Sequence, residues 1–530
     1  MLLDIQQGGT RRTLQDVLDL QGLLLSMMQQ ESSNAGSGDS GQQHSQPRAP
    51  PPLWLQQLVP RVTRAKLLER WCAKCLVLIG PKSISSLTFL FSAPNCGATT
   101  AGTRSGGVDG GDDGQQQRQQ LMHVMSTVAH YFDTCSHGRM KLPAERNLVL
   151  GPISLPACSG VAPTKGAYDL ASGRGNGVNL DGELYGLWDL AKEWMRKNRP
   201  DLFAARLLYN RQTLLFPLGQ LNASDPAAVS GAYSLGRAAS GVVSVRNMGC
   251  PGPDDFIPSA ISPADCLNWV SPAAPPSPVA DAVALIRSHL LNNGFAHPTA
   301  SRLVCGDAGG SDSSSCRTEP YGDPSDPMGP AEPVNAAGNV VCPAAPQSYL
   351  TDWAAQIEEL KGTPAAGEGF VPYEVPSMHT AETNFLRIAI SQNSVQLAGS
   401  RRKRERAVFV SYRVASPTPG GYDSGLPASL SGRVWVHEYN QTADGLPVDP
   451  NMPPVLLAML EVAGPTFALP DAFGARDALY IRFVSKSNTT ATVELCRTMP
   501  AVESVDDGTC NDGLDNDCDD LADADDPDCR

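Results

Sequence analysis

The stretch Arg287-Ser-His-Leu-Leu-Asn-Asn-Gly-Phe-Ala-His297 decides how this chain is interpreted. The apolar residues of segment 279–291 predict a helix that ends before Gly294. Gly294 and His297 follow the predicted end of the helix. A second stretch, Tyr321-Gly-Asp-Pro-Ser-Asp-Pro-Met-Gly329, is rich in turn-forming residues and carries Met328.

This arrangement resembles the HExxHxxGxxH motif of metzincin peptidases. In that motif two histidines one helical turn apart, and a third beyond the glycine, bind one zinc ion. The motif's glutamate is the general base that activates the zinc-bound water. By the resemblance, Gly294 is the structural turn and His297 the third metal ligand, and Met328 takes the place of the Met-turn methionine beneath the zinc.

Further stretches resemble the gametolysin family, the extracellular, cell-wall-lytic zinc metallopeptidases of volvocine green algae. Besides the Met328 stretch they are SSLTFLFSAPNCG (85–97), YFDTCSHGRMKL (131–142), LLFPLG (214–219), CPAAPQSYLTDWA (342–354) and GRVWVHEYNQT (432–442). The resemblance implies an α/β metzincin-like catalytic domain, with a twisted sheet and a zinc-site helix, followed by a β-sandwich-like domain. It also implies zinc as cofactor and a protein substrate or matrix glycoprotein as partner.

The departures from the motif bear on activity. Arg287 stands in the place of the first histidine, Ser288 in that of the glutamate and Leu291 in that of the second histidine. A catalytic zinc needs about three protein ligands. His289 lies about 200° around the helix from the first ligand place, so it joins His297 at a zinc only if the helix register slips. We predict an impaired peptidase with no assigned catalytic residue. The alternatives are a non-catalytic matrix-binding pseudopeptidase and a zinc helix altered by a misjoined exon.

Changes in amino-acid composition along the chain predict four regions. Residues 1–75 are a low-complexity, degenerate propeptide-like and disordered region, 76–345 the peptidase domain, 346–498 a β-rich domain and 503–530 an acidic tail. In the third region, six apolar segments separated by turn residues predict a sandwich. They are 385–390, 407–414, 433–439, 455–462, 479–484 and 490–495.

Charge and cysteine content limit the class of protein. The tail 503–530 holds twelve acidic residues and one arginine, so it carries most of the formal charge of −14. The nearly neutral remainder does not suggest nucleic-acid binding, and no apolar run is long enough for a membrane span. The 14 cysteines, and sequons at Asn222, Asn440 and Asn488, favour an extracellular or cell-wall location. The first 30 residues show no evident signal peptide.

The tail resembles the Cys/Asp motif CxDGxDNDCDG of many secreted proteins, which is presumed to bind metal. Its alternating aspartates predict a calcium loop, and the alternative is a disordered acidic tail. The predicted ligands are Asp512, Asp515, Asp517, Asp519 and Asp523. Asp520 stands where the motif has glycine. Two disulfides are predicted among four cysteines: Cys496, Cys510, Cys518 and Cys529.

A second zinc-like pattern, His437-Glu438 with Gln441, imitates a HExxQ helix. Its neighbours alternate with a period of two, which predicts a strand in which the side chains do not converge. We therefore do not assign a metal to these residues.

Overall fold

The computed structural model describes much of the chain beyond residue 81. The described residues are 82–92, 112–155, 157, 159–161, 167–169, 180–206, 209, 211–215, 239–242, 267–271, 277–293, 301–305, 316–361, 369–390, 404–442, 453–474, 477–498, 503–506 and 508–530. The chain divides between Cys75 and Leu76, and all described residues lie in the second unit. Region 1–75, predicted to be disordered, lies outside them. No described helix has the length and apolarity needed to cross a bilayer.

A five-stranded, mostly parallel sheet forms the first layer of the fold. Its order is β4-β2-β7-β9-β8, and only the edge strand β8 runs antiparallel to its neighbour. The strands are β2 (Ser86–Ser92), β4 (Asn147–Ser154), β7 (Arg211–Leu215), β8 (Ala239–Val242) and β9 (Leu267–Ser271). Strand β2, which has a parallel neighbour on each side, is buried along nearly all its length, as expected for a parallel sheet covered on both faces.

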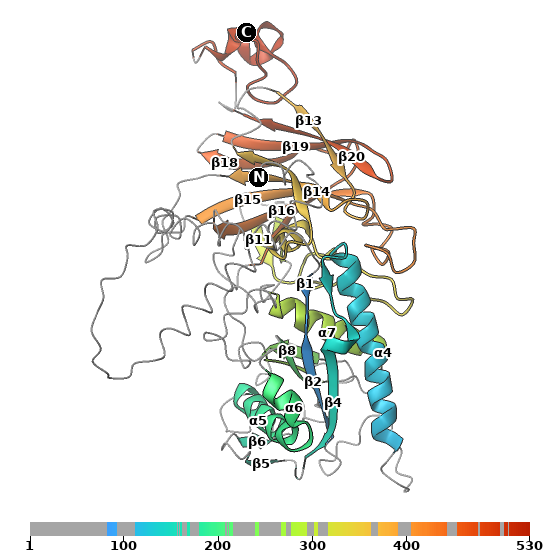
Figure 1. Cartoon of the computed structure of the whole chain (residues 1–530). Coiled ribbons are helices and arrows are strands. Elements are labelled where there is room, and N and C mark those ends of the chain that lie inside the picture. Colours follow the sequence, from blue (N-terminus) through green and yellow to red (C-terminus); the bar gives the residue numbers. More distant parts are fainter. Residues whose placement is uncertain are drawn as a thin grey trace, which may run out of the picture. The chain divides into compact units, whose positions relative to one another are not determined.

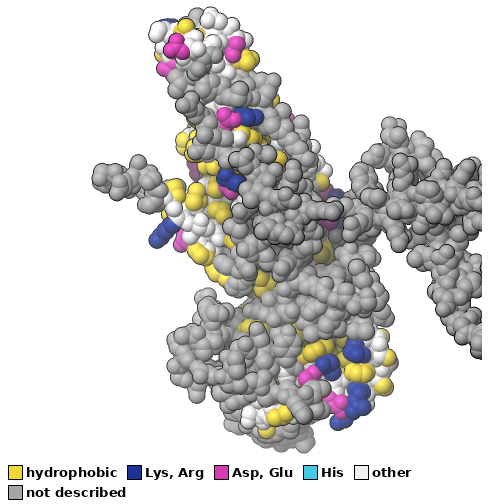
Figure 2. All heavy atoms as spheres, turned by 90° about the vertical axis from the view of Figure 1, so that its left-hand side faces the viewer, with side chains coloured by type: hydrophobic (Ala, Val, Ile, Leu, Met, Phe, Trp, Pro, Cys, Tyr) yellow, Lys and Arg dark blue, Asp and Glu magenta, His cyan; other side chains and the backbone are white. Residues whose placement is uncertain are grey.

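Helices cover both faces of this sheet (Figure 1). They are α4 (Asp112–Cys135), α5 (Leu180–Asn198), α6 (Pro200–Ala205) and α7 (Pro278–Asn292). Leu87, Phe89 and Phe91 of β2 pack with α5, while Leu90 packs with α4 and α7 on the other face. This alternation follows from the two-residue period of a strand. On α5, oppositely charged neighbours alternate along the exposed face, which appears in Figure 2 as intermixed acidic and basic side chains.

The helix predictions hold in part. The apolar stripe of residues 184–195 predicts a helix near 181–198, which is confirmed as α5, and the helix predicted over 279–291 is confirmed as α7. The Gly/Asp/Gln-rich composition of 101–120 predicts a loop, and residues 121–132 predict a helix, but helix α4 begins at Asp112. That loop prediction is wrong for 112–120. The glutamines that make this segment look unstructured are good helix formers once a packed face extends the helix.

A β-sandwich follows, made of a seven-stranded and a four-stranded sheet. Their orders are β11-β10-β17-β16-β15-β14-β12 and β13-β20-β19-β18. The strands are β10 (Ser301–Cys305), β11 (Cys316–Glu319), β12 (Ala355–Lys361), β13 (Val371–Pro376), β14 (Thr383–Ile390), β15 (Arg404–Arg413), β16 (Arg433–Thr442), β17 (Val455–Leu460), β18 (Phe467–Gly474), β19 (Asp477–Lys486) and β20 (Thr490–Arg497). Leu386, Val408, Ile481 and Val493 belong to the core shared by the two sheets.

All six predicted strands of this region are present, as β14, β15, β16, β17, β19 and β20. Prolines interrupt the apolar pattern of β13 and β18, which were not predicted. Both are edge strands of the four-stranded sheet, where proline is tolerated because one side of the strand needs no ladder partner. Strand β12 has the composition of a helix and forms the edge of the seven-stranded sheet.

The seven-stranded sheet is also buried on its second face. Phe385, Phe409 and Tyr439 belong to a core cluster that includes residues of α4 and α7 as well as Met328. The sandwich and the α/β layer are therefore continuous through this cluster. Short elements complete the described chain: β1 (Lys82–Ser83), β3 (Met140–Lys141), η1 (Ala144–Arg146), β5 (Ser159–Val161), β6 (Ala167–Asp169), α8 (Ala345–Leu350), η5 (Thr509–Asn511), η6 (Asp523–Asp525) and η7 (Pro527–Cys529).

Candidate functional site

Helix α7 carries the candidate zinc positions into the interior of the protein. Its first turn is capped by Ser277, whose hydroxyl accepts a hydrogen bond from the backbone N–H of Ala280 at 3.3 Å, and Pro278 fits the first helical position. Its last turn is closed by Asn293, whose backbone N–H donates to the carbonyl of His289 at 3.0 Å. Between the caps the helix is largely buried, which fits its apolar composition.

Arg287, in the first-ligand place, points at the turn around Met328. Its Nε donates to the carbonyl of Pro327 at 2.9 Å. Its Nη2 donates to the carbonyls of Gly329 at 3.2 Å and Ala331 at 3.1 Å. Burial lowers the pKa of this guanidinium, and the nearby carboxylates of Glu332 and Asp326 oppose the shift. The guanidinium of Arg287 therefore binds the carbonyls of the turn, and it does so from the helix position that holds the first zinc ligand in the metzincin motif.

Carboxylates shape the turn itself. Asp326 accepts hydrogen bonds from the backbone N–H of Met328 at 2.8 Å and of Ala344 at 3.2 Å. Asp323 accepts from the backbone N–H of Ser325 at 2.9 Å. A Cβ on Gly329 would lie 2.3 Å from the carbonyl oxygen of Asp323, so only glycine fits there. Burial, together with the charge of Asp323, raises the pKa of Asp326 to about 6.

A buried ionic network ties this turn to the sandwich. Arg413 pairs with Asp423 at 2.6 Å, and both side chains are fully buried. The same guanidinium donates to the carbonyls of Ser325 and Cys342, each at 2.7 Å. Cys342 also forms a disulfide with Cys135 at the end of α4. The turn is therefore fixed from three sides: by α7, by β15 and by the disulfide.

His437 and Glu438 lie on strand β16, which confirms the strand prediction for the HExxQ-like pattern. His437 Nε2 lies 2.9 Å from Asp323 Oδ2, in a pair that is 1% exposed on each side. Glu438 instead pairs with Arg406 at 2.8 Å. The two side chains have different partners, so they do not converge on a common ion.

The other α7 positions have separate environments. Ser288 accepts a hydrogen bond from Asn268 of β9 at 2.6 Å, and Leu291 is buried in the same core cluster as Met328. His289 packs edge-on against the ring of Phe132 of α4, with ring centroids 6.0 Å apart. Neither of its ring nitrogens has a hydrogen-bond partner in the described chain. Burial, with a smaller contribution from the charge of Arg211, lowers its pKa to about 3.

The zinc that the resemblance implies does not fit these residues. Zinc needs neutral imidazoles or anionic ligands, whereas the first and second ligand places hold a guanidinium and an aliphatic side chain. The guanidinium also uses its donors on three carbonyls, so it is part of the packing. Gly294 and His297 lie outside the described residues.

The C-terminal residues 503–530 form a second candidate site. The two predicted disulfides are confirmed as Cys496–Cys518 and Cys510–Cys529. Asp520, in the place of the motif's glycine, has a φ of 73°, which is the left-handed conformation that glycine adopts without strain. Asp512 and Asp523 accept backbone hydrogen bonds within the loop, as described below. Asp515, Asp517 and Asp519 each bring one carboxylate oxygen within 4.8 Å of the others.

Several residues of the first site were missed from the sequence. The Asp323–His437 pair, the Arg413–Asp423 pair and the Cys135–Cys342 bridge join residues far apart in the chain. The only local signal was the repeated Asp-Pro in the Met328 stretch, since an aspartate at such a position commonly accepts backbone hydrogen bonds in a turn.

One protein-family model and one known protein match the chain. Residues 307–452, which include the turn around Met328, match the model of the gametolysin peptidase M11 family. Over 431 residues the chain is 26% identical to autolysin of Chlamydomonas reinhardtii. That match covers 76% of this chain and 64% of autolysin, so the chain spans somewhat less than two thirds of that protein. No solved structure matches the chain. The two matches confirm the resemblance carried by the sequence motifs.

Proposed function

We propose that the chain is a non-catalytic member of the gametolysin family, which its match over residues 307–452 and its similarity to autolysin support. It keeps the folded peptidase framework outside the cell and binds a protein or glycoprotein of the cell wall or matrix without hydrolysing it. The observation that carries this proposal is the guanidinium of Arg287, which donates to the carbonyls of residues 327, 329 and 331 from the first-ligand place.

The environment of Arg287 supports the proposal that the chain does not bind a catalytic zinc. A divalent cation beside a guanidinium would repel it, and moving the guanidinium away would leave three carbonyls without their donor. Ser288 also cannot replace a glutamate as a general base, because a neutral hydroxyl is a poor proton acceptor. Loss of a positioned general base commonly lowers a rate by about 10² to 10⁴.

An extracellular location is supported by the disulfides. Three bridges, Cys135–Cys342, Cys496–Cys518 and Cys510–Cys529, lie within the described chain. Disulfides of this kind form and persist in oxidising compartments and are rare in a reducing cytosol.

The first test is the zinc content of the secreted, full-length protein, measured by elemental analysis after dialysis against zinc. We expect far less than one zinc per chain, and no change on His297→Ala. A matched variant with Arg287→His, Ser288→Glu and Leu291→His restores the motif and should gain zinc. About one zinc per wild-type chain, lost in His297→Ala, would instead favour an active or recoverable metallopeptidase.

The binding role needs its own measurement. Purified wall glycoproteins incubated with the wild-type protein should show saturable binding and no new fragments on a gel. Fragments that disappear with a zinc chelator would contradict the proposal even if binding were observed.

A further inference from the structure

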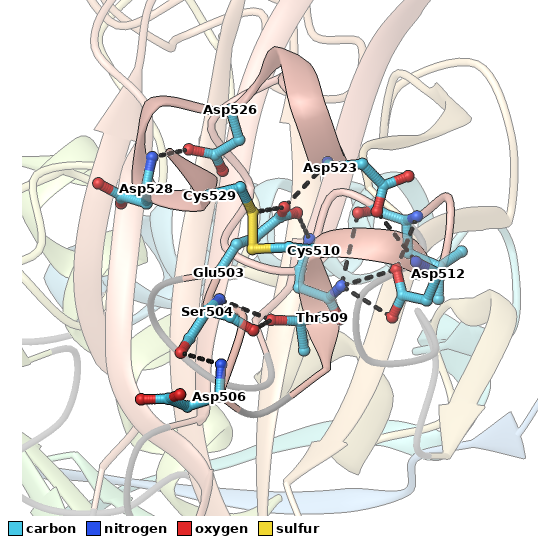
Figure 3. Close-up of a disulfide and its surroundings, with 12 residues drawn as sticks. Glu503, Ser504, Asp506, Thr509, Cys510, Asp512, Asp523, Asp526, Asp528 and Cys529 are labelled. Carbon is cyan, nitrogen blue, oxygen red and sulfur yellow. Dashed lines mark hydrogen bonds between the residues drawn. A yellow bond between two sulfur atoms is a disulfide. The ribbon is translucent and has the colours of Figure 1, made fainter.

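The C-terminal module, residues 503–530, is held together with little apolar packing. Among its side chains whose burial the structure describes, Cys510 and Cys518 are the buried apolar ones, and each belongs to a disulfide. The remaining order comes from short 3-10 turns and from carboxylates that accept backbone hydrogen bonds (Figure 3). Acidic side chains are visible on the surface of this module in Figure 2.

Two of the predicted loop carboxylates bind the loop's own backbone. Asp523 accepts hydrogen bonds from the N–H groups of Asp512 and Gly513, each at 2.9 Å, one on each carboxylate oxygen. Asp512 accepts from the N–H of Leu514 at 3.0 Å and from the amide of Asn516. These two aspartates therefore shape the loop.

A different set of three carboxylates converges inside the module. One oxygen each from Glu503, Asp517 and Asp526 lies within 4.8 Å of the others. Glu503 is 1% exposed and Asp526 is fully buried. The carboxylate of Glu503 accepts hydrogen bonds from the backbone N–H groups of Asn516 at 2.9 Å and of Asp523 at 3.0 Å, so the loop fixes its position.

Two oxygens of this trio have no partner in the described chain. In Asp526, Oδ1 accepts the backbone N–H of Asp528 at 2.7 Å, whereas the buried Oδ2 accepts no hydrogen bond. Figure 3 shows this difference between the two oxygens of Asp526. Oδ1 of Asp517 is likewise buried without a partner. Buried carboxylate oxygens without donors are costly, so each calls for an explanation.

The charges of the trio are also uncompensated within the described chain. Arg482 pairs with Asp520 at 2.6 Å and with Glu494, and none of the three carboxylates forms an ion pair within the described residues. One oxygen of each of these three carboxylates lies within 4.8 Å of the others, so their negative charges repel one another. A bound cation would remove this repulsion.

We propose that Glu503, Asp517 and Asp526 are the inner ligands of a calcium site. Asp515 and Asp519 each bring one carboxylate oxygen within 4.8 Å of an oxygen of Asp517, so they add negative charge beside this site. Two oxygens that bind one calcium ion at 2.3–2.6 Å are at most about 5 Å apart, and the separations within the trio meet this limit. All the donors are oxygens, and the cysteines of the module are used in disulfides, which disfavours zinc or copper.

The test is calorimetric titration of the chelator-treated, full-length protein with CaCl₂, and separately with MgCl₂. We expect about one calcium per chain, bound more tightly than magnesium. Glu503→Gln and Asp526→Asn should each weaken calcium binding at least about tenfold. The control Asp506→Asn changes an exposed carboxylate of the same module and should leave the affinity unchanged.

A second readout separates ligands from residues that merely hold the fold. Without calcium, Asp517→Asn should raise the melting temperature of the module, because it removes one charge from the repelling trio. With calcium it should lose the ligand-induced rise of the wild type. Wild-type affinity in Glu503→Gln and Asp526→Asn would overturn the proposal. A lower calcium-free melting temperature in Asp517→Asn would overturn it too, as would the absence of calcium binding at millimolar concentration. None of these outcomes depends on Arg287, so the proposed function is tested separately.

Discussion

The turn around Met328 and the C-terminal module both concentrate polar groups, yet they differ in how the charge is neutralised. At the turn, Arg287 and Arg413 donate to backbone carbonyls, and Arg413 also neutralises Asp423. In the module, Glu503, Asp517 and Asp526 converge without a basic side chain. A site that supplies its own cation does not require an ion, whereas a site with only carboxylates does. If this difference holds, removing either internal cation should destabilise the turn.

The largest effect is expected from Arg413→Met. It leaves the carboxylate of Asp423 buried and unpaired, which commonly costs about 3–5 kcal/mol of unfolding free energy. The double variant with Asp423→Leu should recover part of this loss, because the remaining charge is removed. Urea unfolding followed by tryptophan fluorescence measures both. If the single and double variants lost the same unfolding free energy, the unpaired charge of Asp423 would not be the cause of the loss.

Arg287→Met should come next. The carbonyls of Pro327, Gly329 and Ala331 lose their charged donor, for which we expect about 2–4 kcal/mol. The matched control is Arg196→Ala on α5, where solvent screens the exposed pair with Glu193, so its removal should leave the unfolding midpoint almost unchanged. If both variants unfolded at the same urea concentration, Arg287 would not stabilise the turn.

The acid response of α7 should be smaller and tied to pH. The pKa of His289 is lowered to about 3 by burial, so the folded chain keeps it neutral while the unfolded chain protonates it below about 6.5. Stability that is present above pH 6.5 is therefore lost as the pH falls from 6.5 toward 3. Between pH 7.5 and 5 the wild type should lose about 2 kcal/mol more than His289→Leu. Parallel pH profiles for the two proteins would contradict this assignment.

The smallest effect on stability is expected at Asp520, which has a left-handed backbone conformation in the C-terminal module. Asp520→Gly and Asp520→Ala both remove the pair with Arg482, so their difference isolates the cost of the backbone conformation. Glycine adopts a φ of 73° freely, so the Gly variant should be more stable than the Ala variant by about 1 kcal/mol. The comparison is best made by thermal melting with the disulfides intact. A more stable Ala variant would show that the turn relaxes.

Local sequence determined much of this protein. The six predicted strands of the sandwich, helices α5 and α7 and the strand at His437 follow from periodicity, which depends on neighbours a few residues apart. The four C-terminal cysteines and the replacements at 287, 288 and 291 were also evident from the sequence. These features need only the identity and spacing of nearby residues.

Tertiary structure decided the contacts that matter at both sites. The donors of Arg287 reach carbonyls 40 to 44 residues along the chain, and Cys135 reaches Cys342 across 207 residues. Glu503 precedes the predicted calcium loop and Asp526 follows it, so no local pattern brought them together with Asp517. Such pairings depend on how buried layers and disulfides place distant segments, and a local period carries no information about them.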